Sequence, residues 1–142
     1  MKPLLKTLPS ALVILLFVYA AGSKLANLDL FRVQLHRQTF PHAWASVLLY
    51  AIPAAELVTV ALLLFNRTAL QGLLSSLALL IVFTVYICLV LSHWWDRVPC
   101  PCGSILNHLS WNAHLWFNLA FIAANLVAIN IHLVERRLTA TT

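Results

Sequence analysis

The stretch QGLLSSLALLIVFTVYICLVLS, Gln71–Ser92, decides the fold, because it runs for 22 residues without a charged side chain. An α-helix needs about 20 predominantly apolar residues to cross the hydrocarbon core of a bilayer. Three further apolar runs of similar length lie at about 7–26, 45–65 and 111–133. These runs are long and rich in leucine and alanine, whereas the strands of a membrane β-barrel are short and alternate apolar with polar residues. The sequence therefore predicts an all-α integral membrane four-helix bundle, with residues 1–142 forming one four-span domain.

The composition of the whole chain also indicates a membrane protein. Of its 142 residues, 62% are hydrophobic and 9% are charged, and the mean hydropathy is +0.90. Such a chain has too little polar surface to coat a soluble globule of this size, so its surroundings are predicted to be the lipid bilayer. The net charge is +5, but the basic residues lie between and beside the apolar runs and not along one polar face. This distribution argues against a nucleic-acid partner.

Lysine and arginine near the ends of the spans indicate the orientation, because they are enriched in cytoplasmic loops. With the N-terminus inside, the cytoplasmic side holds Lys2, Lys6, Arg67, Arg136 and Arg137, and the outer side holds Lys24, Arg32, Arg37 and Arg97. We therefore expect both termini in the cytoplasm and the loop between the third and fourth spans on the outer, periplasmic face. The alternative is that Met1–Ala20 is a cleaved signal peptide, since it has a basic start, an apolar middle and a small-residue end. Cleavage would leave three spans and turn the sequence ERRL, Glu135–Leu138, outward, against the charge rule.

That outer loop carries a CxC motif within VPCPCGSILNHLSW, Val98–Trp111. Disulfides form and persist on the oxidising face of a membrane. A disulfide between Cys100 and Cys102 would close a very small ring, and departures from relaxed disulfide geometry make the bond easier to reduce. Strained and exposed disulfides have the more oxidising potentials. The motif therefore predicts a pair that passes oxidation on by thiol exchange.

Four residues near the cysteines are candidates to support this chemistry. Arg97 and the N-terminal end of the helix expected to begin near Ser110 favour the thiolate form of a cysteine that they approach. His93 and His108 bracket the pair and are placed to shuttle its protons. Gly103 leaves the neighbouring thiol of Cys102 less crowded, which favours Cys102 as the nucleophile.

Other interpretations of the cysteines remain open. Cys100 and Cys102 could be unreactive loop thiols, or soft ligands that bind Cu(I) or Zn(II) together with His93 or His108. A second pair with ligand spacing is absent from the sequence, so no metal site is predicted. Cys88 lies inside the third apolar run, and we interpret it as a small buried hydrophobe.

Polar residues inside the spans are further candidates. Lys24 lies near the outer end of the first span and Glu56 near the middle of the second. Ionisable groups in membrane spans usually face the bundle interior and find partners, so the two residues either pair to fix the helix register or carry protons. In the fourth span Trp111, Asn118, Asn125 and His132 recur every seven residues, with His114 beside them. Such a stripe most often forms hydrogen bonds to neighbouring helices; the other interpretation is a polar track for a cofactor or protons.

Four stretches together resemble a known family. They are AAGSKLANLDLF (20–31), YAIPAAELVTVALLL (50–64), CPCG (100–103) and LSWNAHLWFNL (109–119). In this order they are similar to the redox-associated membrane proteins of the MauE and DoxX group, where MauE is a methylamine-utilisation protein, and to the short Bacteroidetes-type members in particular. The residues that match recurring positions of the family are Lys24, Glu56, Cys100, Cys102, Gly103 and Asn118. Where MauE-like sequences commonly read Cys-Gly-Cys-Phe-Gly, this chain has Pro101 between the cysteines and Ser104 after the glycine.

The resemblance implies a four-span protein of the bacterial inner membrane. Its relatives are linked to forming or transferring disulfides beside thioredoxin-like partners, and DoxX-type relatives are linked to quinone. We therefore expect a candidate thiol–disulfide oxidoreductase that exchanges electrons through Cys100 and Cys102 with a periplasmic thioredoxin-like or other cysteine-containing protein, with quinone as the candidate cofactor. The alternatives are a non-catalytic membrane subunit or assembly factor and a protein that binds a soft metal. The sequence leaves the oligomeric state open, a homo-oligomer included.

Overall fold

A computed structural model describes residues 2–38, 41–94 and 110–140 of the chain. The described residues form five helices, which are α1 (Lys2–Ala26), α2 (Leu28–His36), α3 (His42–Leu64), α4 (Ala69–Leu91) and α5 (Trp111–Ala140). All except α2 are long and apolar enough to cross a membrane. The predicted all-α fold with four membrane-length helices is therefore confirmed.

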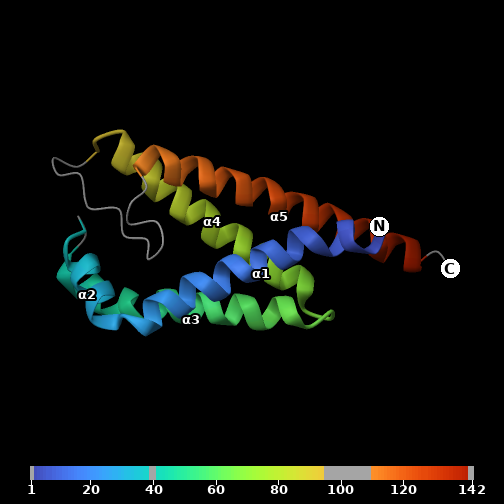
Figure 1. Ribbon diagram of the computed structural model, residues 1–142, viewed down its shortest axis with the longest axis horizontal. Coiled ribbons are helices and arrows are strands. Elements are labelled where there is room, and N and C mark those ends of the chain that lie inside the picture. Colours follow the sequence, from blue (N-terminus) through green and yellow to red (C-terminus); the bar gives the residue numbers. More distant parts are fainter. Residues whose placement is uncertain (1, 39–40, 95–109, 141–142) are drawn as a thin grey trace.

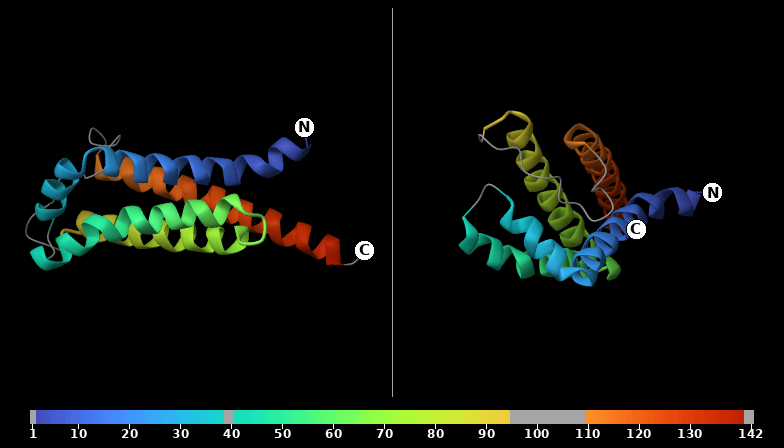
Figure 2. Two further views of the ribbon diagram at one scale, coloured as in Figure 1. Left: turned by 90° about the horizontal axis from the view of Figure 1, so that it is seen from below. Right: turned by 60° about the vertical axis from the view of Figure 1, so that its left-hand side comes forward.

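The four long helices form a closed ring of contacts. Helix α1 packs against α3 and α5, and α4 packs against the same two helices from the other side. Both termini and the turn between α3 and α4 lie at one end, and α2 lies at the other (Figures 1 and 2). We call the end that carries α2 the α2 end. Each long helix runs antiparallel to the long helix before it in the chain, so four spans bring the two termini to the same end.

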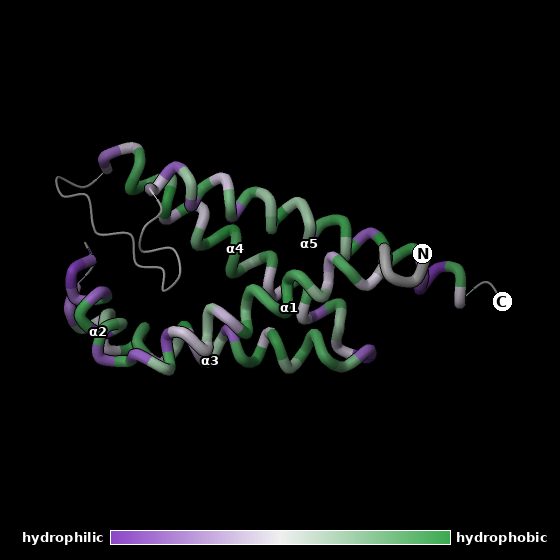
Figure 3. The backbone as a smooth tube through the Cα atoms, viewed as in Figure 1, coloured by the Kyte–Doolittle hydropathy of each residue, from purple (hydrophilic) through white to green (hydrophobic). Residues whose placement is uncertain are grey.

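The interior of the ring contains an apolar cluster, and the outer faces are apolar as well. Val13, Phe17, Leu73, Leu80 and Ala128 belong to one buried cluster to which all four long helices contribute. Large apolar side chains are also exposed on the outside of the four long helices. The hydrophobic residues of these helices are coloured green in Figure 3. A helix that is hydrophobic all round suits a lipid environment, since lipid tails cover the outer face as protein covers the inner one.

Helix α2 lies between the first two apolar runs, in a segment for which the sequence predicts no span. Its sequence LDLFRVQLH is amphipathic, and Phe31 and Leu35 on its apolar face pack against Ala45 and Leu49 of α3. The hydrophobic face is only a few residues wide, so it does not stand out as an apolar run. This packing holds α2 against the first turns of α3.

Helix α5 extends further than the apolar run predicted for the fourth span. It reaches Ala140, seven residues beyond position 133, and Glu135, Arg136 and Arg137 lie exposed on its last turns. A helix of 30 residues is about 45 Å long, whereas the hydrocarbon core is about 30 Å thick. The charged turns therefore extend beyond the apolar part of the helix, where they can meet water.

Helices α3 and α4 approach closely beside the turn that joins them. A Cβ atom built on Gly72 would lie 2.8 Å from both the backbone nitrogen and the Cγ of Leu63, and 3.0 Å from the carbonyl carbon of Leu62. Gly22 in α1 has open space around the same position. Small residues at helix contacts let backbones come close in a membrane, and here only glycine fits.

We expect Gly72→Ala to lower the free energy of unfolding by about 1–3 kcal/mol, because the added methyl group overpacks a contact with backbone atoms. Reversible unfolding of the purified protein in mixed detergent micelles measures this. Gly22→Ala is the matched control and should raise the stability by up to about 1 kcal/mol, because alanine favours the helix and its methyl group meets no other atom. Equal effects of the two substitutions would show that the close approach at Gly72 does not limit the packing.

Candidate functional site

An ion pair joins the first two long helices inside the bundle. The Lys24 Nζ atom lies 2.7 Å from Glu56 Oε1, and the two side chains are 13% and 11% exposed. The long lysine side chain extends inward from near the end of α1, as such side chains can. The structure thus brings together the two ionisable residues that the sequence places in different spans.

Other groups complete the surroundings of this ion pair. Lys24 Nζ also donates to the carbonyl oxygen of Ala20 at 3.1 Å and lies 5.9 Å from the ring centroid of Phe31 in α2. The ammonium group is therefore held by a carboxylate, a backbone carbonyl and the face of an aromatic ring. The second carboxylate oxygen, Glu56 Oε2, is buried and has no hydrogen-bond partner among the described residues. This oxygen is the acceptor that remains available for a water molecule or a bound donor.

The polar stripe of α5 faces α4. The Asn125 side chain is fully buried and its amide lies 2.6 Å from Ser76 Oγ. With its oxygen turned toward Ser76, the amide accepts from that hydroxyl and from the Leu77 N–H at 3.1 Å, and donates to the Leu73 carbonyl at 3.3 Å. Two turns closer to the α2 end, Asn118 donates to Thr84 Oγ1 at 3.4 Å. The asparagines thus link α5 to α4 by hydrogen bonds.

The two histidines of the same helix have unpaired nitrogens. His114 is 5% exposed and its Nδ1 is buried without a hydrogen-bond partner in the described part of the chain. Its ring lies 6.5 Å from that of Trp111, which in turn meets Tyr86 of α4 at 6.4 Å. His132 Nε2, nearer the termini, is likewise buried and without a described partner. Neither nitrogen lies in a described group of three or more metal-ligating side chains.

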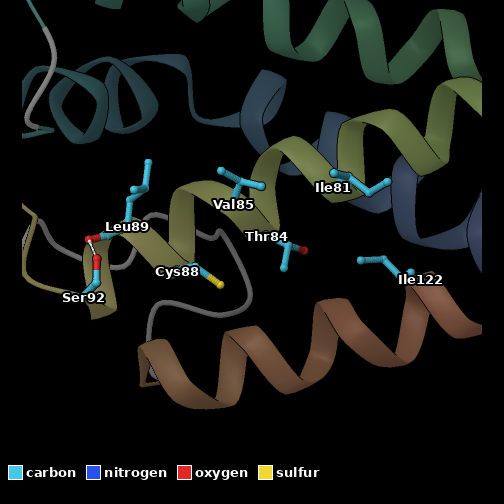
Figure 4. Close-up of a pocket in the computed structure, with 7 residues that line it drawn as sticks. All are labelled: Ile81, Thr84, Val85, Cys88, Leu89, Ser92 and Ile122. Carbon is cyan, nitrogen blue, oxygen red and sulfur yellow. Dashed lines mark hydrogen bonds between the residues drawn. The ribbon is translucent and has the colours of Figure 1, made fainter.

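Cys88 is exposed, so its interpretation as a small buried hydrophobe is wrong. Its neighbour Ile87 takes the fully buried position on α4, and one residue further the helix has turned by about 100°. Figure 4 shows the Cys88 thiol directed toward α5 in an apolar groove. The groove has a volume of about 360 Å³ and is lined by Ile81, Thr84, Val85, Cys88, Leu89, Ser92 and Ile122.

Most of the predicted redox residues lie outside the described residues, namely Arg97, Cys100, Cys102, Gly103 and His108. His93 is described, and it lies two residues beyond the end of α4. Its backbone has a positive φ of 53°, its Nδ1 lies 3.0 Å from the Leu91 carbonyl oxygen, and the next residue, Trp94, donates its N–H to the Leu89 carbonyl at 3.3 Å. This left-handed cap satisfies carbonyls at the end of the helix. His93 therefore helps to set the direction in which the chain leaves α4.

Comparison with known proteins gives the family. A family model described as methylamine utilisation protein MauE matches residues 1–131. The chain belongs to the MauE family. The match extends from α1 through most of α5 and includes the cysteine segment, so the family resemblance found in the sequence is confirmed. No curated protein and no solved structure matches the chain. Membership in the MauE family and the four apolar helices together identify a membrane protein.

Sequence reasoning missed the partners of the α5 asparagines. Ser76 and Thr84 lie in the uncharged run of α4 eight residues apart, and Asn118 and Asn125 lie seven apart in α5. Both spacings return to about the same face of a helix after two turns. In an antiparallel helix pair, matching polar spacings of seven and eight residues are the signal that could have paired them.

Breaking the buried ion pair should destabilise the bundle. Each of Lys24→Met and Glu56→Gln should cost about 3–5 kcal/mol of unfolding free energy, because the remaining partner is left in a low-dielectric interior. The double variant Lys24→Met/Glu56→Leu should recover most of that loss, since no uncompensated charge remains. Unfolding in detergent mixtures measures all three variants.

The matched control for these ion-pair variants is the exposed pair of Asp29 and Arg32, which are 3.7 Å apart on the surface of α2. Asp29→Asn should cost no more than about 1 kcal/mol, as is usual for exposed pairs. A double variant no more stable than the worse single one would contradict the assignment of the loss to an unpaired charge.

The two asparagine contacts should differ in strength. A double-mutant cycle of Asn125→Ala and Ser76→Ala should give a coupling energy of about 0.6–1.7 kcal/mol, the range for hydrogen bonds between membrane helices. The cycle of Asn118→Ala and Thr84→Ala should give a smaller value, because that contact is longer. A larger coupling at Asn118 than at Asn125 would contradict this order.

Proposed function

We propose that this MauE-family protein is a membrane thiol–disulfide redox protein that exchanges electrons through Cys100 and Cys102. The observation that carries the proposal is the position of the CxC motif in the chain. The motif lies between the end of α4 and the start of α5, and both of these ends lie opposite the termini (Figure 1). The basic residues at the terminal end include Arg67, Arg136 and Arg137. The charge rule then puts the terminal end in the cytoplasm and the α2 end in the periplasm.

The packing of α1 supports a retained first span. Val13 and Phe17 of α1 are buried in the bundle. A bundle from which Met1–Ala20 had been cleaved would lose these contacts and expose the interior faces of α3 and α5. This supports a multi-pass protein that keeps its first span, which we propose to lie in the bacterial inner membrane with cytoplasmic termini.

The proposed exchange moves two electrons between cysteine pairs. In the oxidised protein, a thiolate of a periplasmic thioredoxin-like partner attacks one sulfur of the Cys100–Cys102 disulfide, and the other cysteine leaves as a thiolate. The second thiol of the partner then resolves the mixed disulfide, so that the partner leaves oxidised and the CxC pair is a dithiol. A membrane quinone would reoxidise that dithiol by accepting two electrons and two protons.

The quinone-linked version has one structural support. The groove on α4 ends at Ser92, at the same end of the bundle from which the cysteine segment starts, and its lining is almost entirely apolar. Its volume of about 360 Å³ falls in the range of about 300–1,000 Å³ that is typical of small-molecule sites.

The redox state of the cysteines in intact cells tests the proposal. Cells are quenched with acid and free thiols are alkylated with a mass tag, in growing cultures, after a mild reductant and with respiration blocked. We expect Cys100 and Cys102 to be mainly oxidised in growing cells, readily reduced, and to shift toward the dithiol when respiration stops. Cys88→Ser is the matched control, and it should remove one tag without changing the response of the pair.

A pair that stays a dithiol in all three cultures would contradict disulfide exchange. Activity of the partner system that survives Cys100→Ser/Cys102→Ser but not Glu56→Gln would instead indicate a non-catalytic subunit.

A further inference from the structure

Two histidines meet at the corner between α2 and α3, away from the cysteines in sequence. His36 is the last residue of α2 and His42 is the first residue of α3. Their Nδ1 atoms lie 3.0 Å apart and their ring centroids 5.2 Å apart, so the two nitrogens are the facing edges of the rings. Both side chains are exposed. At most one of the two nitrogens carries the hydrogen between them, so a nitrogen lone pair is always directed into this contact.

The corner is held from several sides. Phe31 and Leu35, which precede His36 in α2, pack this helix against α3. Pro41 caps α3, and its carbonyl accepts the N–H of Trp44 at 3.0 Å. The Tyr86 hydroxyl of α4 donates to the side-chain oxygen of Gln38, which ties the chain after α2 to the bundle. The two imidazoles are therefore positioned by packed elements on both sides, and little ordering is left to be done when they bind a common ligand.

We propose that His36 and His42 bind a divalent transition-metal ion, Cu²⁺ above all, through their two Nδ1 atoms. Imidazole nitrogen is a ligand that suits copper, zinc and nickel. Nitrogens 3.0 Å apart that each lie about 2.0–2.1 Å from a metal subtend an angle of about 90–100° there. This angle corresponds to adjacent positions of a tetragonal site, the geometry typical of Cu(II) and Ni(II).

Binding requires only a small rearrangement. The one hydrogen that the two Nδ1 atoms share moves to Nε2 of the same ring or leaves when the metal binds. Rotation about χ2, a soft torsion, then turns both lone pairs toward a common point. Because both rings are exposed, solvent can fill the other coordination positions. The described residues offer no third histidine, cysteine or carboxylate at this site, so its affinity comes from two ligands held at a high effective concentration. Copper is the strongest binder among the divalent ions of its row.

Copper titration of the full-length protein in detergent tests the site. Cys88→Ser/Cys100→Ser/Cys102→Ser serves as the parent, so that no thiol competes for copper. We expect one Cu²⁺ with an axial electron paramagnetic resonance spectrum that shows coupling to two nitrogens. His36→Ala and His42→Ala should each weaken binding by about tenfold or more, because the second ligand of a pair binds intramolecularly, and should leave coupling to one nitrogen. Zn²⁺ should compete for the same site.

Asp29→Asn is the matched control, since Asp29 is an exposed carboxylate on the same helix as His36 and pairs with Arg32. It should leave the affinity and the spectrum unchanged. Circular dichroism and thermal unfolding check that each variant is folded as the parent is. Copper affinity that is unchanged in His36→Ala/His42→Ala, or reduced as much in Asp29→Asn, would overturn the proposal. Because the parent lacks the CxC pair, the outcome is independent of the proposed thiol exchange.

Discussion

A polar side chain inside a membrane bundle has no water to bind, and this constraint organises the structure. Lys24 meets Glu56, and Asn125 meets Ser76, because a charge or an amide left alone in hydrocarbon costs free energy. Between them these contacts join α1 to α3 and α5 to α4. Apolar packing favours association of the helices with little preference for register, whereas a hydrogen bond or an ion pair forms in only one register. The few polar residues therefore determine which faces of the long helices meet.

The same constraint separates the two ends of the molecule. The terminal end holds a tight turn, where Gly72 lets α3 and α4 touch, and the charged last turns of α5. The other end holds α2, the ion pair beside Phe31, the exposed histidine pair and both ends of the cysteine segment. The ion pair and the histidine pair thus lie at the α2 end of the bundle, where the cysteine segment also begins and ends in the chain. The interior, in contrast, uses its polar groups for contacts between helices.

Three buried atoms do not fit this purely structural role. Glu56 Oε2, His114 Nδ1 and His132 Nε2 have no hydrogen-bond partner among the described residues. Buried polar groups are usually paired, so this carboxylate oxygen and these imidazole nitrogens are the interior atoms best able to form a hydrogen bond with a bound molecule. Glu56 lies on α3 and both histidines lie on α5, where the asparagine contacts to α4 continue from His114 toward the middle of the bundle.

The sequence by itself determined the fold class, because the length and hydrophobicity of a membrane span are local properties that one uncharged run such as 71–92 already displays. It also indicated Lys24, Glu56 and the α5 stripe as interior residues, since charge and helical period are read along a single chain. Only the tertiary structure decided which residues meet. The rotation of each helix about its own axis depends on all its neighbours at once, and this rotation exposed Cys88, paired Asn125 with Ser76 and packed α2 on α3 so that His36 faces His42.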